Sequence, residues 1–264
     1  MKLLEERIQK DGEVRPGGIL KVDGFLNHRI DPRLSYEMAM ELKRRYEGEK
    51  INKILTIEAS GIALAIMTAY VFDCPMVFAK KSRTRNISDH VWSVEIESFT
   101  HGTTNTVLVS KEYLEAKDRV LIVDDFLATG AALKGLKELV EKAGGTVVGA
   151  GIAIEKLFQG GGNRLRAEGM RIESLAKVAA MTDDSIMFEE KSKTENAGPR
   201  AGNAWSCIFG IMRNEETGIG GGRQGPGEVP SRGERRPTED GEQDRELHEK
   251  TLPGKNRQQS GPRR

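Results

Sequence analysis

The chain has few cysteines and almost no net charge. The 264 residues include two cysteines, Cys74 and Cys207. Two cysteines cannot form a disulfide framework, so they favour a protein of a reducing compartment. The 41 basic and 40 acidic residues nearly cancel. The whole chain therefore offers no electrostatic basis for binding nucleic acid or a membrane surface.

Long hydrophobic runs are also missing. The apolar stretch at residues 62–72 is much shorter than the roughly 20 residues that a membrane-spanning helix needs. The N-terminal segment MKLLEERIQK carries charges along its whole length, and it lacks the apolar core of a signal peptide. We therefore expect a soluble, cytoplasmic protein.

Residues 191–264 have few apolar side chains and many residues that break regular structure. They hold 6 of the 9 prolines and 13 of the 30 glycines, and only residues 205–212 (WSCIFGIM) form an apolar patch. Such a segment buries too little surface to offset its loss of conformational entropy. We predict one folded domain at residues 1–190 and a disordered tail at 191–264, to which we assign no function.

The rest of the chain alternates between apolar runs typical of buried strands and periodic patterns typical of helices. We expect strands at residues 51–57, 75–79, 119–123, 146–155, 171–178 and 185–188, and a turn that leads into a short strand at residues 17–22. We expect helices at residues 2–11, 31–48, 62–72 and 163–168, and a further one after residue 132. Two β-rich segments, 91–99 and 106–109, predict an inserted antiparallel hairpin with its turn at His101-Gly102. This order indicates an α/β fold with a parallel-rich sheet flanked by helices.

Residues 120–132 (VLIVDDFLATGAA) are the centre of the predicted site. An apolar strand ends at Asp124 and Asp125, and the small residues 128–132 then lead into a helix. Backbone N–H groups at a helix N-terminus bind phosphate, whereas carboxylates repel phosphate and accept hydrogen bonds from hydroxyls. A sugar phosphate satisfies both parts of this stretch. The alternative is a buried strand that ends in a solvated acidic turn.

The same stretch resembles the phosphoribosyl pyrophosphate (PRPP) signature of type I phosphoribosyltransferases: an apolar run, Asp-Asp, two apolar residues and Ala-Thr-Gly. Residues 20–28 (LKVDGFLNH), 57–62 (IEASGI) and 154–156 (IEK) extend the resemblance to the bacterial xanthine phosphoribosyltransferases, over roughly residues 1–190. It implies the type I phosphoribosyltransferase fold with a small N-terminal hood, Mg²⁺ bound with PRPP, and a homodimer. The implied activity transfers the 5-phosphoribosyl group of PRPP to xanthine, giving XMP and pyrophosphate in purine salvage.

The resemblance also assigns the residues that bind PRPP. Asp124 and Asp125 are the expected catalytic residues and hold the ribose hydroxyls. The other expected PRPP contacts are the 5′-phosphate loop (Ala128, Thr129, Gly130, Ala131 and Ala132) and the pyrophosphate residues (Ser60, Gly61 and Lys81). Ala132 departs from the pattern, because many relatives carry a hydroxyl residue near the end of this loop. The backbone amides must therefore do most of the binding.

Each pyrophosphate contact also has a structural interpretation. Ser60-Gly61 is either an anion-binding loop or a simple turn before a helix. Lys81, in the basic cluster with Lys80 and Arg83, either neutralises pyrophosphate or belongs to a solvated surface run. Position relative to residues 120–132 favours the functional interpretation of the Ser60-Gly61 loop, and we prefer Lys81 to Arg83.

Leu20, Asn27 and Lys156 are the expected xanthine contacts. Lys156 follows an apolar strand that should lie beside the strand of Asp124. Its ammonium donates hydrogen bonds and cannot accept them, which favours a 6-oxopurine over adenine. Asn27 can both donate and accept, as a dioxo purine edge requires. In the alternative, Lys156 is a strand-end lysine that reaches solvent, and Phe158 is either a stacking partner of the base or a core residue.

Other functions stay open on the sequence alone. The same fold could serve hypoxanthine and guanine, or adenine. A PRPP-sensing transcription regulator is an alternative of a different class, because a fold by itself does not determine function. Such regulators usually carry a DNA-binding domain ahead of the PRPP fold. Here fewer than twenty residues precede the hood, and their helix is not strongly basic.

Overall fold

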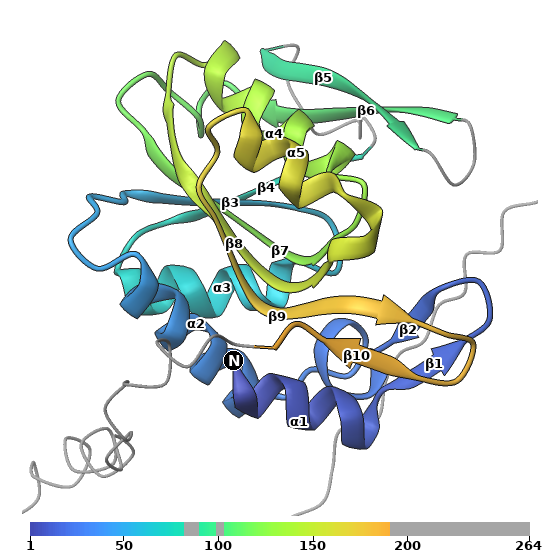
Figure 1. Ribbon diagram of the computed structural model, residues 1–264. Helices are drawn as coiled ribbons and strands as arrows, with labels where there is room; N and C mark the ends of the chain where they lie inside the picture. The colour runs from blue at the N-terminus through green and yellow to red at the C-terminus, as the bar shows by residue number, and fades with distance from the viewer. Residues whose placement is uncertain (82–89, 99–102, 191–264) are drawn as a thin grey trace, which may run out of the picture. The chain divides into compact units, whose positions relative to one another are not determined.

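The computed structural model describes residues 1–81, 90–98 and 103–190 (Figure 1). Three predicted features lie outside these described residues: the hairpin turn at His101-Gly102, the basic residue Arg83 and the tail at 191–264. No helix within the described ranges is long and apolar enough to cross a membrane.

A six-stranded sheet forms the centre of the described domain. Its strand order is β10-β9-β8-β7-β3-β4, and every neighbouring pair is parallel except β9 and β10. Parallel neighbours need long crossover connections, which helices supply in this chain. The α/β fold with a parallel-rich sheet is thereby confirmed. The strands are β3 (Lys53–Ile57), β4 (Met76–Ala79), β7 (Arg119–Leu127), β8 (Thr146–Lys156), β9 (Ile172–Met181) and β10 (Ile186–Phe188).

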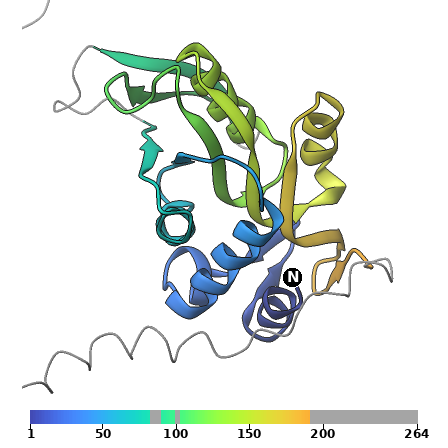
Figure 2. The same cartoon turned by 90° about the vertical axis from the view of Figure 1, so that its left-hand side faces the viewer.

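Helices cover both faces of the sheet (Figure 1 and Figure 2). In β7, Leu121 and Val123 pack in the core with α2 and α3, whereas Val120 and Ile122 pack in a second core with α4 and α5. This division follows from the alternation of side chains along a strand. The helices are α2 (Pro32–Arg45), α3 (Ile62–Phe72), α4 (Ala131–Lys142) and α5 (Gly161–Ala167).

The start of α2 is determined by local sequence, and its end by packing. The Asp31 carboxylate accepts hydrogen bonds from the N–H groups of Arg33 and Leu34 at 3.1 and 3.2 Å, as an N-cap residue does. The helix ends at Arg45, before the expected Gly48. Tyr46 leaves the helical conformation, buries its ring and donates from its hydroxyl to the carbonyl oxygen of Ala150 at 2.9 Å.

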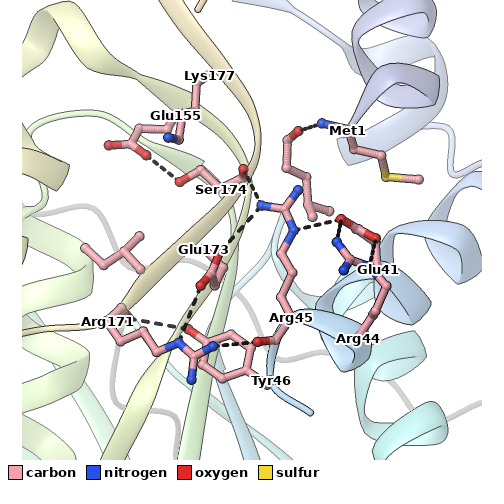
Figure 3. A network of polar contacts seen from close by, with 12 residues as sticks. Met1, Glu41, Arg44, Arg45, Tyr46, Glu155, Arg171, Glu173, Ser174 and Lys177 are labelled. Carbon is pink, nitrogen blue, oxygen red and sulfur yellow. Dashed lines mark hydrogen bonds and ion pairs between the residues drawn. The ribbon is translucent and has the colours of Figure 1, made fainter. Parts of the chain in front are cut away.

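A polar network fastens the C-terminal end of α2 to β9 (Figure 3). Arg45 donates to the carbonyl oxygen of Ser174 at 3.0 Å and pairs with Glu41 at 2.8 Å. Burial alone would raise the pKa of Glu41, but hydrogen bonds from Arg44 and Arg45 outweigh burial and lower the pKa to about 2. The Glu41 carboxylate therefore stays ionised at neutral pH, and the network stays intact.

The hood, residues 13–27, consists of three short elements after α1 (Lys2–Asp11). They are β1 (Glu13–Arg15), β2 (Ile19–Lys21) and the π-helical turn η1 (Asp23–Asn27). β1 and β2 pair in an antiparallel ribbon, and η1 buries Phe25 and Leu26 in the core. Only one strand was expected here, because three to five residues are too few to show a periodic pattern.

The inserted hairpin is confirmed, and its second strand is longer than the expected 106–109. β5 (Val91–Ser98) and β6 (Thr103–Ser110) pair in an antiparallel ladder. Lys80 exchanges two backbone hydrogen bonds of 2.9 Å with Leu108, which connects the hairpin to the β4 edge of the sheet. The hairpin also packs on α4, where a Cβ atom on Gly135 would lie 2.4 Å from Cδ1 of Ile96.

Two element boundaries near the predicted site differ from expectation. β7 continues to Leu127, so Asp124 and Asp125 lie within the strand rather than after it. Pairing with β3 stops at Ile122, but the long β8 keeps pairing as far as Leu127 and Glu155. α5 starts two residues earlier than expected, because the glycines at 160–162 obscure its helical pattern.

Candidate active site

The carboxylate pair, Asp124 and Asp125, lies near the carboxyl ends of the parallel strands, where α/β sheets bind ligands. The two residues are 7% and 5% exposed. Nδ2 of Asn27 donates to Oδ2 of Asp125 at 3.1 Å, and Oγ of Ser60 donates to Oδ1 of Asp125 at 3.0 Å. One carboxylate thus joins β7 to the hood and to the loop at residues 58–61.

The surroundings of Asp124 disfavour the ionised form of its carboxyl group. Its Oδ1 accepts a hydrogen bond from the N–H of Asp125 at 2.9 Å, and a Cβ atom on Gly61 would lie 2.8 Å from the same oxygen. Burial raises the pKa of the Asp124 carboxyl well above its ordinary value, and the charge of Asp125 raises it further, whereas the charge of Lys81 opposes them. Hydroxyl donors or a cation would therefore stabilise the ionised pair.

The 128–132 loop follows the carboxylate pair directly. Gly130 is the N-cap of α4 and has a φ of +82°, a left-handed conformation that glycine adopts without steric cost. α4 begins at Ala131, and its N-cap glycine has no side chain that could cap the amides of the first turn. Thr129 carries the only hydroxyl of the loop. Backbone amides at a helix N-terminus suit a phosphate, and this role of the loop stays a prediction.

The 58–61 loop leads from β3 into α3. The Glu58 carboxylate accepts a hydrogen bond from the N–H of Lys81 at 2.7 Å, which places the start of the basic segment next to this loop. The peptide bond between Glu58 and Ala59 is cis. Ser60 contacts Asp125 and Gly61 contacts Asp124. Two of the three predicted pyrophosphate residues, Ser60 and Gly61, therefore lie against the carboxylate pair, and Lys81 lies next to their loop.

Lys156 lies between β7 and the hood. Its Nζ donates to the carbonyl oxygen of Gly18 at 2.8 Å and lies 5.6 Å from the centroid of the Phe126 ring. Burial lowers the pKa of Lys156. Leu20 is buried, whereas Phe158 is 46% exposed and lies close to Gly18. Phe158 is therefore not a core residue, and the recognition of a base by Lys156, Leu20 and Asn27 stays a prediction.

Lys80 does not join the other predicted site residues. Its Nζ lies 5.9 Å from the centroid of the Phe78 ring. Both side chains line a pocket of about 730 Å³ along β4 and β6, together with Lys53 and Tyr113. None of the predicted substrate-binding residues lines this pocket. The carboxylate pair, rather than the pocket along β4, therefore defines the candidate site in the described part of the chain.

Two residues at the site, Phe126 and Gly161, were not predicted from the sequence. Phe126 lies near the ammonium of Lys156. Glu58 was expected as part of the pyrophosphate loop, but its hydrogen bond with the N–H of Lys81 was not. Gly161 packs against the 128–132 loop, where its Cβ atom would lie 2.3 Å from the carbonyl oxygen of Ala128. The three successive glycines at 160–162 were the available signal, because glycine permits close backbone approach.

The carboxylate pair offers oxygen donors, which Mg²⁺ prefers. In residues 1–81, 90–98 and 103–190, no group of three or more His, Cys, Asp or Glu side chains could hold a metal ion. A Mg²⁺ ion at the pair would therefore take further oxygen ligands from a substrate. The raised pKa of Asp124 fits such a group, because a cation favours the ionised carboxylate.

Comparison with known proteins agrees with this geometry. Residues 33–162 match the phosphoribosyl transferase domain family. The chain is 53% identical over 190 residues to a xanthine phosphoribosyltransferase of Finegoldia magna, covering 72% of this chain and 100% of that protein. The corresponding protein of Alkaliphilus metalliredigens is 49% identical over 201 residues, covering 76% and 100%.

A solved structure shows the same fold. The adenine phosphoribosyltransferase of Thermoanaerobacter pseudethanolicus aligns with a TM-score of 0.55 and 28% identity, over 66% of this chain and 99% of that one. The two curated relatives are matched over their whole length by 190 and 201 residues of this chain. The chain therefore belongs to the xanthine phosphoribosyltransferase family of the type I phosphoribosyltransferases.

Proposed function

We propose that the protein transfers the 5-phosphoribosyl group of PRPP to xanthine, giving XMP and pyrophosphate in purine salvage. The carboxylate pair carries this proposal, since Asn27 and Ser60 hold Asp125 beside the 128–132 loop. Acceptors for ribose hydroxyls thereby lie next to amides for a phosphate. The 53% identity to a xanthine phosphoribosyltransferase supports the choice of base.

The carboxylate pair has a direct role in the proposed mechanism. A ring nitrogen of the base forms a bond to the anomeric carbon of PRPP while the bond from that carbon to pyrophosphate breaks, and the proton of that ring nitrogen is released to solvent. Positive charge develops on the ribose ring during this step. Asp125 accepts hydrogen bonds from the ribose hydroxyls, and Asp124 beside it stabilises the developing positive charge. Two bound reactants held in contact also avoid the entropy cost of a bimolecular encounter.

The negative charge of the departing pyrophosphate needs donors on the opposite side. The amides of Ser60 and Gly61 precede α3 and suit an anion, and the ammonium of Lys81 lies in the adjacent segment. Mg²⁺ held by PRPP oxygens and the carboxylate pair would supply further charge neutralisation when bound. These amides and cations bind the leaving pyrophosphate more strongly as its negative charge grows, and they therefore stabilise the transition state more than the bound substrates.

Lys156 provides the argument for an oxopurine. Its ammonium donates a hydrogen bond to the carbonyl oxygen of Gly18. An ammonium can only donate, so any further partner must be an acceptor. An exocyclic oxo group is an acceptor, whereas the amino group of adenine presents N–H donors. Asn27 of the hood has an Oδ1 that is buried and has no hydrogen-bond partner in the described structure. An N–H of the base would satisfy this acceptor.

The proposal extends to a homodimer in the cytoplasm. Ile66 and Tyr70 of α3 and Phe78 of β4 are 51%, 68% and 37% exposed, and because α3 and β4 contact one another, we propose these side chains as part of the dimer surface. Light scattering tests the assembly: we expect twice the mass of one chain for the native protein. A monomeric mass at micromolar concentration would contradict this part of the proposal.

Product formation from PRPP and Mg²⁺ with xanthine, guanine, hypoxanthine and adenine side by side tests the function. We expect the highest kcat/KM for xanthine and the lowest for adenine. A preference for adenine would contradict the role of Lys156. Retention on DNA at physiological salt without turnover of any base would contradict the enzyme and favour a PRPP-sensing regulator.

A further inference from the structure

The short helix α5 is in direct contact with the 128–132 loop. The N–H of Gly161 donates to the carbonyl oxygen of Ala128 at 3.2 Å, and Nη2 of Arg164 donates to the carbonyl oxygen of Thr129 at 2.9 Å. A Cβ atom on Gly130 would lie 3.1 Å from Cδ1 of Leu165. α5 therefore engages two successive carbonyl groups of the loop and covers the next residue.

These contacts determine where the loop amides point. The described cis peptide bond is Glu58–Ala59, and the peptide bonds of the 128–132 loop are trans. In a trans peptide unit the C=O and the N–H point in opposite directions. Because the carbonyl groups of Ala128 and Thr129 face α5, the N–H groups of Thr129 and Gly130 face away from it. These two amides can therefore reach a phosphate in the loop, together with the amides of the first turn of α4.

An ion pair between the partly exposed Arg166 and the buried Glu155 anchors α5 to the sheet. Both nitrogens of the Arg166 guanidinium fork, Nη1 and Nη2, donate to the two carboxylate oxygens of Glu155, each at 2.7 Å. The Glu155 side chain is 1% exposed and also accepts from Ser174 (Figure 3). Burial alone would raise the pKa of Glu155, but hydrogen bonds from Arg166 and Ser174 outweigh it and lower the pKa.

α5 depends on this ion pair because it is too short to be stable without contacts to the rest of the domain. A helix of 7 residues is far below the roughly 12 residues at which isolated helices become marginally stable. The N-terminal end of α5 also packs closely against Glu155, since a Cβ atom on Gly162 would lie 1.9 Å from Oε1 of Glu155. The Glu155 carboxylate therefore lies against the α5 backbone as well as its Arg166 side chain.

We propose that Glu155 and Arg166 are positioning residues for the 5′-phosphate site. Their ion pair holds α5 against the 128–132 loop, and α5 turns the amides of Thr129 and Gly130 toward the phosphate. This inference rests on the proposed function. Neighbouring residues of β8 then serve the two parts of the site separately, because Glu155 contacts α5 whereas Lys156 contacts the hood.

The test is a comparison of Glu155→Gln, Arg166→Met and Arg166→Lys with the native chain. Calorimetry measures the Kd for ribose 5-phosphate, and steady-state kinetics measure KM for PRPP and for xanthine. We expect Glu155→Gln and Arg166→Met to raise the Kd and the KM for PRPP about tenfold, as loss of a supporting partner typically does, at unchanged KM for xanthine. Arg166→Lys should recover part of the loss, because it keeps the charge.

Two further variants separate positioning from general destabilisation. Glu49→Gln removes a carboxylate from an exposed ion pair with Arg171 and is the matched control, with native Kd and KM values. Gly161→Ala leaves the Glu155–Arg166 pair intact and pushes a methyl group against Ala128, so it should weaken ribose 5-phosphate binding even if Glu155→Gln fails to fold.

Two results would overturn the inference. One is unchanged ribose 5-phosphate binding in Gly161→Ala or in folded Glu155→Gln. The other is an equal rise of both KM values. These outcomes differ from a failure of the proposed function, in which the native chain turns over none of the bases. The binding measurement still decides the role of Glu155 and Arg166 in that case.

Discussion

The ribose-phosphate part and the base part of the site are built in different ways. Asp124, Asp125 and the 128–132 loop follow one another in one strand–loop–helix unit of β7 and α4. The base part joins Lys156 to the hood, where its hydrogen-bond partner Gly18 is 138 residues distant in sequence. A continuous unit makes the reaction class readable in the sequence, whereas the choice of base depends on segments that only folding brings together.

The largest effect should come from Asp125, which belongs to the ribose-phosphate part and accepts a hydrogen bond from Asn27 of the hood. Asp125→Asn removes the charge that faces the ribose and one of the two acceptors used by Asn27 and Ser60. We predict a loss of kcat/KM of about a hundredfold or more, the usual cost of removing a preorganised charged group, together with a raised KM for xanthine. Steady-state kinetics check this, with the exposed Asp183→Asn as the control. A native KM for xanthine would show that Asp125 does not couple the two parts.

A substitution at Lys156 should affect the base part of the site and leave the ribose-phosphate part unchanged. We predict that Lys156→Ala raises the KM for xanthine by about tenfold to a hundredfold, the range for one charge-assisted hydrogen bond, and leaves PRPP binding unchanged. Lys156→Arg keeps a donor and should lose less. Equal losses for xanthine and PRPP would mean that Lys156 has a structural role in β8.

We expect the ionised carboxyl group of Asp124 to lower the stability of the folded chain when no substrate is bound. Because folding raises its pKa, the folded chain keeps a proton that the unfolded chain releases above the ordinary value of 3.8. This contribution to stability is complete below that pH and is lost as the pH rises toward the folded pKa. Asp124→Asn has no carboxyl group to ionise.

We therefore predict that the Tm of Asp124→Asn exceeds that of the native chain by an amount that grows as the pH rises above about 3.8, while turnover falls sharply. Thermal unfolding across acidic to neutral pH measures the difference. A difference that stays constant with pH would show that the Asp124 carboxyl is not the titrating group.

The smallest effect should come from the C-terminal segment. A chain truncated after Lys191 should keep the native kcat/KM and Tm, because the predicted site and both cores lie before that residue. Kinetics and thermal unfolding of the truncated chain check this. Loss of activity or folding on truncation would show that residues 192–264 take part in the domain.

Most helices and strands could be predicted, because their signals are local. The Asp31-Pro32 start of α2 and the apolar length of α3 required no knowledge of neighbours. The ends of β7 and α2 could not be predicted. β7 extends because β8 offers backbone partners beyond Val123, and α2 stops because Tyr46 packs into the core. Both reasons are contacts with distant segments.

The sequence by itself determined the order of elements, the carboxylate pair and the loop that follows it. These features depend on side-chain type and on spacing within one segment, which are local properties of the chain. Tertiary structure alone decided that Asn27 and Ser60 meet on Asp125, that Lys156 reaches the hood and that α5 backs the 128–132 loop. The physical reason is that hydrogen bonds between distant segments depend on how strands and helices pack, and no local pattern records that packing.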